Sequence, residues 1–150
     1  MPEYESKPLP DVVERFMRYV QIDSQSDPEH DDVTPSTPRQ HGMARYLGEE
    51  LTSLGCTDVT VDEHAYVTGT FPASPDAQSA PALMLCSHLD SVIDAPAAGI
   101  KPHIVHYEGG NLVAGVVAGE KIETTPEQVP DLEKFVGMDI VCSDGSTLLS

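Results

Sequence analysis

The sequence predicts an α/β fold in which helices precede and flank a mixed sheet. Three observations support this class. The length of 150 residues suits about one domain, because domains typically have ~100–200 residues. Apolar residues recur at helical spacing over the first third of the chain, and after it the pattern changes to short β-branched runs. The hydrophobic fraction of 39% permits a core, although globular domains usually reach ~45–50% when glycine is counted.

The first third of the chain predicts two helices separated by a long loop. Residues 9–20 carry one continuous apolar stripe at helical spacing, formed by Leu9, Val12, Val13, Phe16, Met17 and Val20. A second helix is expected from Arg39 to Leu54, with Gly55 placed to end it in a left-handed cap. The polar segment 23–38 contains three prolines and is therefore expected to be an irregular loop. We expect residues 1–8 to be disordered.

The next segments predict strands. Val59 and Val61 alternate with polar neighbours and residues 66–71 are β-branched and aromatic, so a hairpin-like pair is expected. Residues 82–87, ALMLCS, form a short apolar run without alternation. This pattern is typical of a strand that is buried on both faces of a sheet, with Cys86 as a small core residue.

Further strands are expected in the last third, at residues 103–107, 111–117 and 139–143. Asp144-Gly145 follows the last of them and suits a two-residue hairpin turn leading to a returning arm at 146–149. The sequence shows no internal repeat and no phosphate-binding glycine pattern.

The charge limits the partners of this protein. Eight Lys and Arg against 25 Asp and Glu give a net charge of −17, which repels nucleic acid and anionic membrane surfaces. No apolar run approaches the ~20 residues of a membrane-spanning helix, and the acidic N-terminus is unlike a signal peptide. The three cysteines form no C-x-x-C pair, which argues against a disulfide framework. These features favour a cytoplasmic protein that binds neither nucleic acid nor membrane.

The most informative local motif is His88-Leu89-Asp90, which follows the apolar run at 82–87. An α/β protein places its site at the carboxyl end of a central strand. Residues two apart in an extended segment point the same way, so the imidazole and the carboxylate can meet. This is the usual arrangement of a zinc-bound histidine with its orienting carboxylate, although a surface pair without a metal fits the same pattern.

Other histidines are weaker candidates. His30-Asp31-Asp32 repeats the motif, but it lies in the acidic loop with no strand before it, so we interpret it as solvated surface. His103 and His106 are three apart in a strand-like run, which places them on opposite faces of a sheet where they chelate poorly together.

Longer segments carry a more specific signal, and it extends over about 130 residues in order along the chain. The segments are RYVQIDSQS (18–26), PST (35–37), ARYLGEELTSLGCTDVTVDE (44–63), YVTGTFPA (66–73), ALMLCSHLDS (82–91), YEGG (107–110) and GMDIVCSDGSTLL (137–149). Together they resemble the N-terminal part of the peptidase T family, cytoplasmic tripeptide aminopeptidases among the di-zinc exopeptidases. The resemblance implies the N-terminal portion of a zinc-exopeptidase catalytic domain.

The resemblance also implies roles for two residues. His88 matches the first zinc-binding histidine, and Asp90 matches the aspartate that counts as catalytic because it clamps that histidine. A complete subunit of the family holds two zinc ions, and a zinc-activated water attacks a small peptide substrate. The bridging aspartate, the glutamate base and the later ligands of the family follow beyond the segment that matches Ser150. We therefore expect an incomplete metallopeptidase domain, inactive by itself and with one assignable zinc ligand.

Two alternatives stay open at the level of the sequence. The same metal site serves related di-zinc dipeptidases and deacylases, whose specificity residues lie mostly beyond position 150. A non-catalytic, acidic interaction module is the second alternative.

Overall fold

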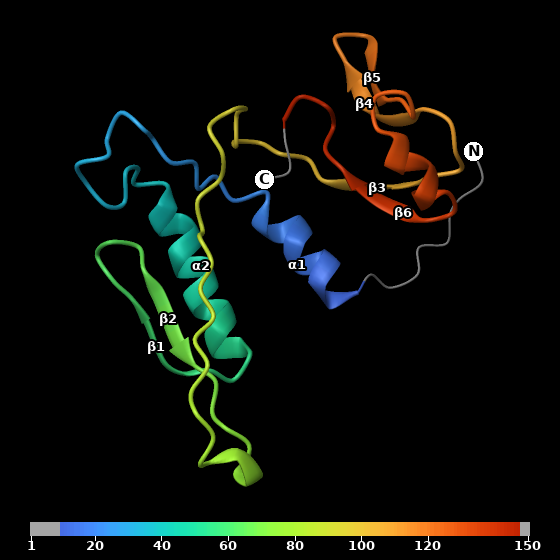
Figure 1. Ribbon diagram of the computed structural model, residues 1–150. Coiled ribbons are helices and arrows are strands. Elements are labelled where there is room, and N and C mark those ends of the chain that lie inside the picture. Colours follow the sequence, from blue (N-terminus) through green and yellow to red (C-terminus); the bar gives the residue numbers. More distant parts are fainter. Residues whose placement is uncertain (1–9, 148–150) are drawn as a thin grey trace. The chain divides into compact units, whose positions relative to one another are not determined.

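A computed structural model describes residues 10–147 and contains helices together with small sheets, as the predicted α/β class requires (Figure 1). The chain divides into two compact units. The central unit comprises Asp23–Ile93, and the terminal unit combines the residues before it with those after it. Each described sheet has two antiparallel strands.

The central unit is built on a helix that packs against a hairpin. Helix α2 spans Gln40–Ser53, and strands β1 (Thr57–Val61) and β2 (Val67–Thr70) pair antiparallel beside it (Figure 1). The helix and the hairpin are in close contact, because a Cβ added at Gly48 of α2 would lie 2.7 Å from the Val61 side chain of β1. The predicted helix and hairpin are confirmed.

The predicted cap at Gly55 is confirmed as well. Gly55 has a φ of +89° and its N–H donates to the Thr52 carbonyl at 3.0 Å, while the Cys56 N–H donates to the Leu51 carbonyl at 3.0 Å. These two bonds define a Schellman motif, in which a left-handed residue satisfies the last carbonyls of a helix.

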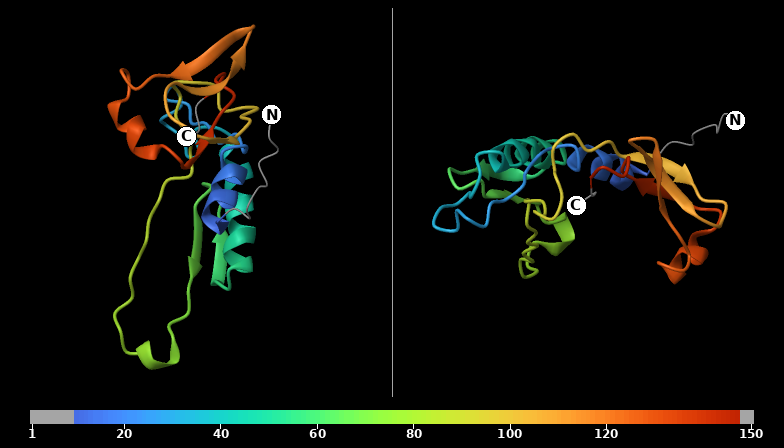
Figure 2. Two further views of the ribbon diagram at one scale, coloured as in Figure 1. Left: turned by 90° about the vertical axis from the view of Figure 1, so that its right-hand side faces the viewer. Right: turned by 90° about the horizontal axis from the view of Figure 1, so that it is seen from above.

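The expected strand at 82–87 does not form. Residues 71–90 make an open excursion with the short 3-10 helix η1 (Pro75–Ala77) at its far end, as the left view of Figure 2 shows. Leu83, Met84 and Leu85 are 84–86% exposed, and the prediction that Cys86 is a core residue is also wrong, since it is exposed. The physical reason is that a strand needs hydrogen-bonded neighbours and covering layers, which residues 10–147 do not place beside this segment.

The terminal unit begins with helix α1 (Asp11–Tyr19), which confirms the predicted helix, although Leu9 lies outside the described residues. None of the α1 residues is buried, and Val12 is 71% exposed. The expected apolar stripe is therefore present on a helix that the described residues cover only in part, with Val13 and Met17 half-buried.

Two antiparallel pairs form the remainder of the terminal unit. Strand β3 (His103–His106) pairs with β6 (Asp139–Cys142), and β4 (Leu112–Val117) pairs with β5 (Glu120–Thr124). The 3-10 helix η2 (Pro130–Phe135) lies between β5 and β6 in sequence. The small core consists of Tyr107, Leu112, Leu132 and Cys142.

Sequence reasoning missed β5 and misplaced one hairpin. Strands β4 and β5 are joined by Ala118 and Gly119, whose φ values of +54° and +88° are those of a type I′ hairpin turn. Residues 145–147 form a bend instead, and β6 pairs with β3. Within residues 143–147 no returning strand forms, and the rest of the expected arm lies outside the described residues.

Segment 143–147 lies directly on the β4–β5 hairpin. A Cβ added at Gly115 of β4 would lie 2.2 Å from the Asp144 carbonyl oxygen, and one added at Gly145 would lie 2.6 Å from the Cβ of Ile122. The Lys101 ammonium contacts the Asp144 carboxylate at 3.1 Å. Glycine at 115 is required by this close approach of two backbones.

Candidate metal-ligand site

The predicted contact between His88 and Asp90 is present. The Nδ1 atom of His88 lies 3.0 Å from the Asp90 carboxylate oxygen and 2.9 Å from the Asp90 backbone carbonyl. The imidazole is 80% exposed and the carboxylate 36%. Residues 88–90 lie in a stretch without regular secondary structure, and the two side chains meet across the single residue between them.

This geometry sets the tautomer of the imidazole. A carbonyl oxygen can only accept a hydrogen bond, so Nδ1 of His88 carries the proton that both Asp90 oxygens share. In the neutral ring the lone pair is then on Nε2, which has no hydrogen-bond partner among residues 10–147. An exposed Nε2 opposite a carboxylate-bound Nδ1 is the form in which histidine ligates a metal.

The loop 23–38 holds the chain immediately after Asp90. Gln25 forms a parallel bridge with Ser91, and its side-chain amide donates to the Val92 carbonyl at 2.8 Å. The Ser91 N–H reaches the Ser24 carbonyl at 3.4 Å. The two residues that follow the motif are therefore anchored to a segment more than 60 positions earlier.

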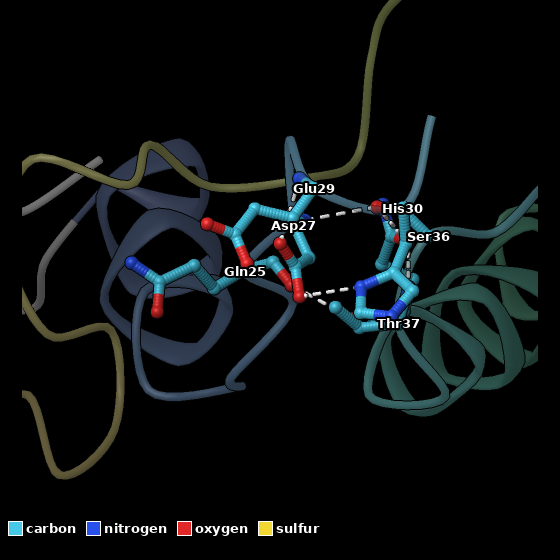
Figure 3. Close-up of polar contacts among 7 residues, drawn as sticks. Gln25, Asp27, Glu29, His30, Ser36 and Thr37 are labelled. Atoms are coloured by element: carbon cyan, nitrogen blue, oxygen red, sulfur yellow. Dashed lines mark hydrogen bonds and ion pairs between the residues drawn. The ribbon is translucent and has the colours of Figure 1, made fainter. Parts of the chain in front are cut away.

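The same loop is stabilised by its own polar network (Figure 3). The Asp27 N–H donates to the Ser36 hydroxyl at 3.0 Å, and the Thr37 hydroxyl donates to the Gln25 carbonyl at 2.7 Å. The backbone N–H of Glu29 and the His30 ring both bind the Asp27 carboxylate and lower its pKa. Sequence reasoning described this segment only as a loop, because these contacts join residues up to 12 positions apart.

The second His-x-Asp motif behaves differently from the first. His30 binds Asp27 at 2.8 Å and is 62% exposed, which agrees with its interpretation as surface. His106 contacts Asp139 across the β3–β6 pair at 2.7 Å, whereas His103 lies 3.4 Å from the Lys101 carbonyl. The two strand histidines therefore contact different residues, Asp139 and Lys101.

Residues 10–147 do not form a complete zinc site. No group of three or more His, Cys, Asp or Glu side chains with metal-binding geometry occurs in residues 10–147. A zinc site in a protein normally has three or four protein ligands. The His88–Asp90 contact has the geometry of a single histidine and an orienting carboxylate, and residues 10–147 form no group of three or more such side chains that could hold a metal.

Comparison with known proteins gives a consistent result. No family model matches the chain, but its sequence is 40% identical over 141 residues to peptidase T of Aliivibrio fischeri. It is 37% identical over 140 residues to peptidase T of a Geobacillus strain and 37% over 142 residues to that of Bacillus velezensis. This chain resembles part of peptidase T.

The similarity to peptidase T covers nearly all of this chain but only a minor part of each relative. It includes 93–94% of this chain and 33–34% of each of those relatives. The chain thus spans about one third of the length of the curated peptidase T sequences that it matches, a share that agrees with the expected resemblance to one part of that protein. No helix within residues 10–147 combines the length and the apolar character needed to cross a membrane.

Proposed function

We propose that this chain provides the first zinc-binding histidine, His88, and its positioning residue, Asp90, to an aminopeptidase of the peptidase T type. The observation that carries the proposal is the 3.0 Å contact between His88 Nδ1 and the Asp90 carboxylate, in a chain 40% identical over 141 residues to a peptidase T. Zinc, two ions per complete subunit, would activate a water and polarise the peptide carbonyl.

Four residues of this chain have specific roles in the proposed function. Asp90 keeps the proton on Nδ1 and thereby directs the Nε2 lone pair of His88 toward the metal. Gln25 and Ser91 hold the backbone after the motif in place. The chain by itself brings one such ligand, so we propose that the isolated 150 residues do not hydrolyse peptides.

The substrate class proposed is a small peptide, with tripeptides preferred, and the proposed location is the cytoplasm. The net charge of −17 disfavours nucleic acid and anionic membranes as partners. Dipeptides, N-acylated amino acids and tripeptides compared as substrates would separate a tripeptide aminopeptidase from the related dipeptidases and deacylases.

A chimera tests the proposal in a complete protein. The matching third of the Aliivibrio fischeri peptidase T is replaced by this chain, and tripeptide hydrolysis is measured with zinc present. We expect turnover that His88→Ala reduces by at least about 1,000-fold. We expect Asp90→Ala to weaken zinc affinity by about 10–100-fold, as loss of a ligand's carboxylate partner generally does.

The chain contains its own matched control. His30 is also followed by an aspartate two positions later and also contacts a carboxylate, but it lies in the loop. His30→Ala should leave both turnover and zinc affinity of the chimera unchanged. Equal losses in His30→Ala and His88→Ala, or full activity in His88→Ala, would refute the assignment.

A further inference from the structure

A single peptide group connects the His88–Asp90 motif to the loop 23–38. The Nδ1 atom of His88 contacts the Asp90 backbone carbonyl at 2.9 Å. The N–H of the same peptide group belongs to Ser91 and donates to the Ser24 carbonyl at 3.4 Å. Because a peptide group is planar, a rotation that turns this N–H away from Ser24 also turns the carbonyl away from the imidazole. The loop therefore orients the imidazole through the backbone.

The side chain of Gln25 makes the shorter of the two hydrogen bonds between the loop and this part of the chain. Its amide donates to the Val92 carbonyl at 2.8 Å, across 67 positions of sequence. The bond between Ser91 and Ser24 is 3.4 Å long, which exceeds the ~2.9–3.0 Å typical of N–H···O bonds. Gln25 and Ser91 also form a parallel bridge. Gln25 is thus the main contact that fixes the backbone directly after the motif.

A buried hydroxyl holds Gln25 in its turn. Thr37 is 6% exposed, and its hydroxyl donates to the Gln25 carbonyl at 2.7 Å (Figure 3). The Thr37 N–H donates to the side-chain oxygen of Gln40, the first residue of α2, at 3.1 Å. Hydrogen bonds therefore lead without interruption from the start of α2, through Thr37 and Gln25, to the chain after the motif.

We propose that Gln25 is a positioning residue for His88, that it acts through the Asp90–Ser91 peptide group, and that Thr37 supports it. The imidazole is 80% exposed, so packing restricts its rotation little. Its direction depends on the two Asp90 oxygens that Nδ1 contacts, and Gln25 keeps the backbone oxygen of that pair in place. The inference rests on the proposed role of His88 as a zinc ligand.

The test observes the His88 ring in the metal-free chain of 150 residues, so its result does not depend on catalysis. Nitrogen NMR of labelled histidines at about pH 9, where the ring is neutral, gives the ratio of the Nδ1–H to the Nε2–H tautomer, and His88→Ala assigns the signal. We expect Nδ1–H to dominate in the parent. Gln25→Met keeps a side chain of similar length but removes the donor. It should lower the tautomer ratio about fivefold, and speed exchange of the Ser91 amide by a similar factor, because one hydrogen bond is lost.

Substitutions of two neighbouring hydroxyls separate positioning from stability. Thr37→Val removes the hydrogen bond to the Gln25 carbonyl and should lower the tautomer ratio at least about twofold, whereas Thr37→Ser keeps the hydroxyl and should restore the ratio. Ser36→Ala is the matched control, because it removes the acceptor of the Asp27 N–H in the same loop. It should destabilise the chain toward urea about as much as Gln25→Met does, and leave the tautomer ratio of His88 unchanged.

The outcomes are distinct. A fall in the ratio confined to Gln25→Met and Thr37→Val would support the proposal. A parent chain in which Nε2–H dominates would overturn it, as would a ratio that Gln25→Met leaves unchanged or that Ser36→Ala lowers equally. In the chimera, Gln25→Met should weaken zinc affinity about fivefold, less than the 10–100-fold expected when the carboxylate partner itself is lost. If Gln25→Met shifts the tautomer while His88→Ala leaves turnover of the chimera unchanged, the positioning is supported and only the proposed function is contradicted.

Discussion

The same substitution, glycine to alanine, should have opposite effects at two positions of this protein. At Gly115 the new Cβ would lie 2.2 Å from the Asp144 carbonyl oxygen and 2.7 Å from its carbonyl carbon. Ordinary contacts begin near 3.4 Å, so the backbones must separate by about 1 Å. No rotamer change can relieve the clash, because both atoms belong to the main chain.

The change in the free energy of unfolding expected for Gly115→Ala follows from two opposing contributions. Inserting a carbon into a packed site costs ~1–3 kcal/mol, and alanine gains ~0.4–1 kcal/mol by restricting the unfolded chain. The difference is centred on about 1.3 kcal/mol, so we expect Gly115→Ala to lower the free energy of unfolding by about 1 kcal/mol. At Gly42, in the first turn of α2, no atom lies within 4 Å of the added Cβ. Gly42→Ala should therefore raise the free energy of unfolding by ~0.5–1 kcal/mol.

Urea unfolding followed by circular dichroism gives both free energies, and hydrogen–deuterium exchange localises the change. In Gly115→Ala, faster exchange should be confined to β4, β5 and residues 143–147. A Gly115→Ala variant as stable as the parent would show that segment 143–147 does not lie on β4 in solution. A loss at Gly42 equal to that at Gly115 would show that the contact at Gly115 is not the cause.

Two further predictions concern titration and thiol reactivity. Hydrogen bonds from Ser146 and from Lys101 hold the pKa of Asp144 at about 2, below its usual 3.8. The stability that this carboxylate provides should be complete above pH 3.8 and lost as the pH falls through about 2. Carbon-detected NMR should give a midpoint near 2 that Ser146→Ala raises, and a parent midpoint near 3.8 would contradict the contact. Burial raises the pKa of the Cys142 thiol, whereas Cys86 is exposed, so Ellman's reagent should modify Cys86 at least about tenfold faster than Cys142. Equal rates before addition of urea would refute this difference in burial.

Several elements could be predicted because their causes are local. The apolar spacing of residues 39–54 and the glycine that follows specify a helix and its end, and α2 with the Gly55 cap follows that pattern. His88 and Asp90 are separated by a single residue, so their contact also has a local cause. The β4–β5 turn at Ala118-Gly119 is local as well, although we do not predict it from the sequence.

The sequence by itself determined the helices, the first hairpin and the His-x-Asp pair, since interactions within a few residues of one another produce them. Only the tertiary structure decided that β3 pairs with β6 and that Gln25 holds the chain after the motif. Only it decided that residues 82–87 are exposed. These outcomes depend on groups more than 30 positions away, or on partners that residues 10–147 do not provide. An apolar run specifies that a strand can be buried, whereas its burial requires neighbouring strands and layers to be present.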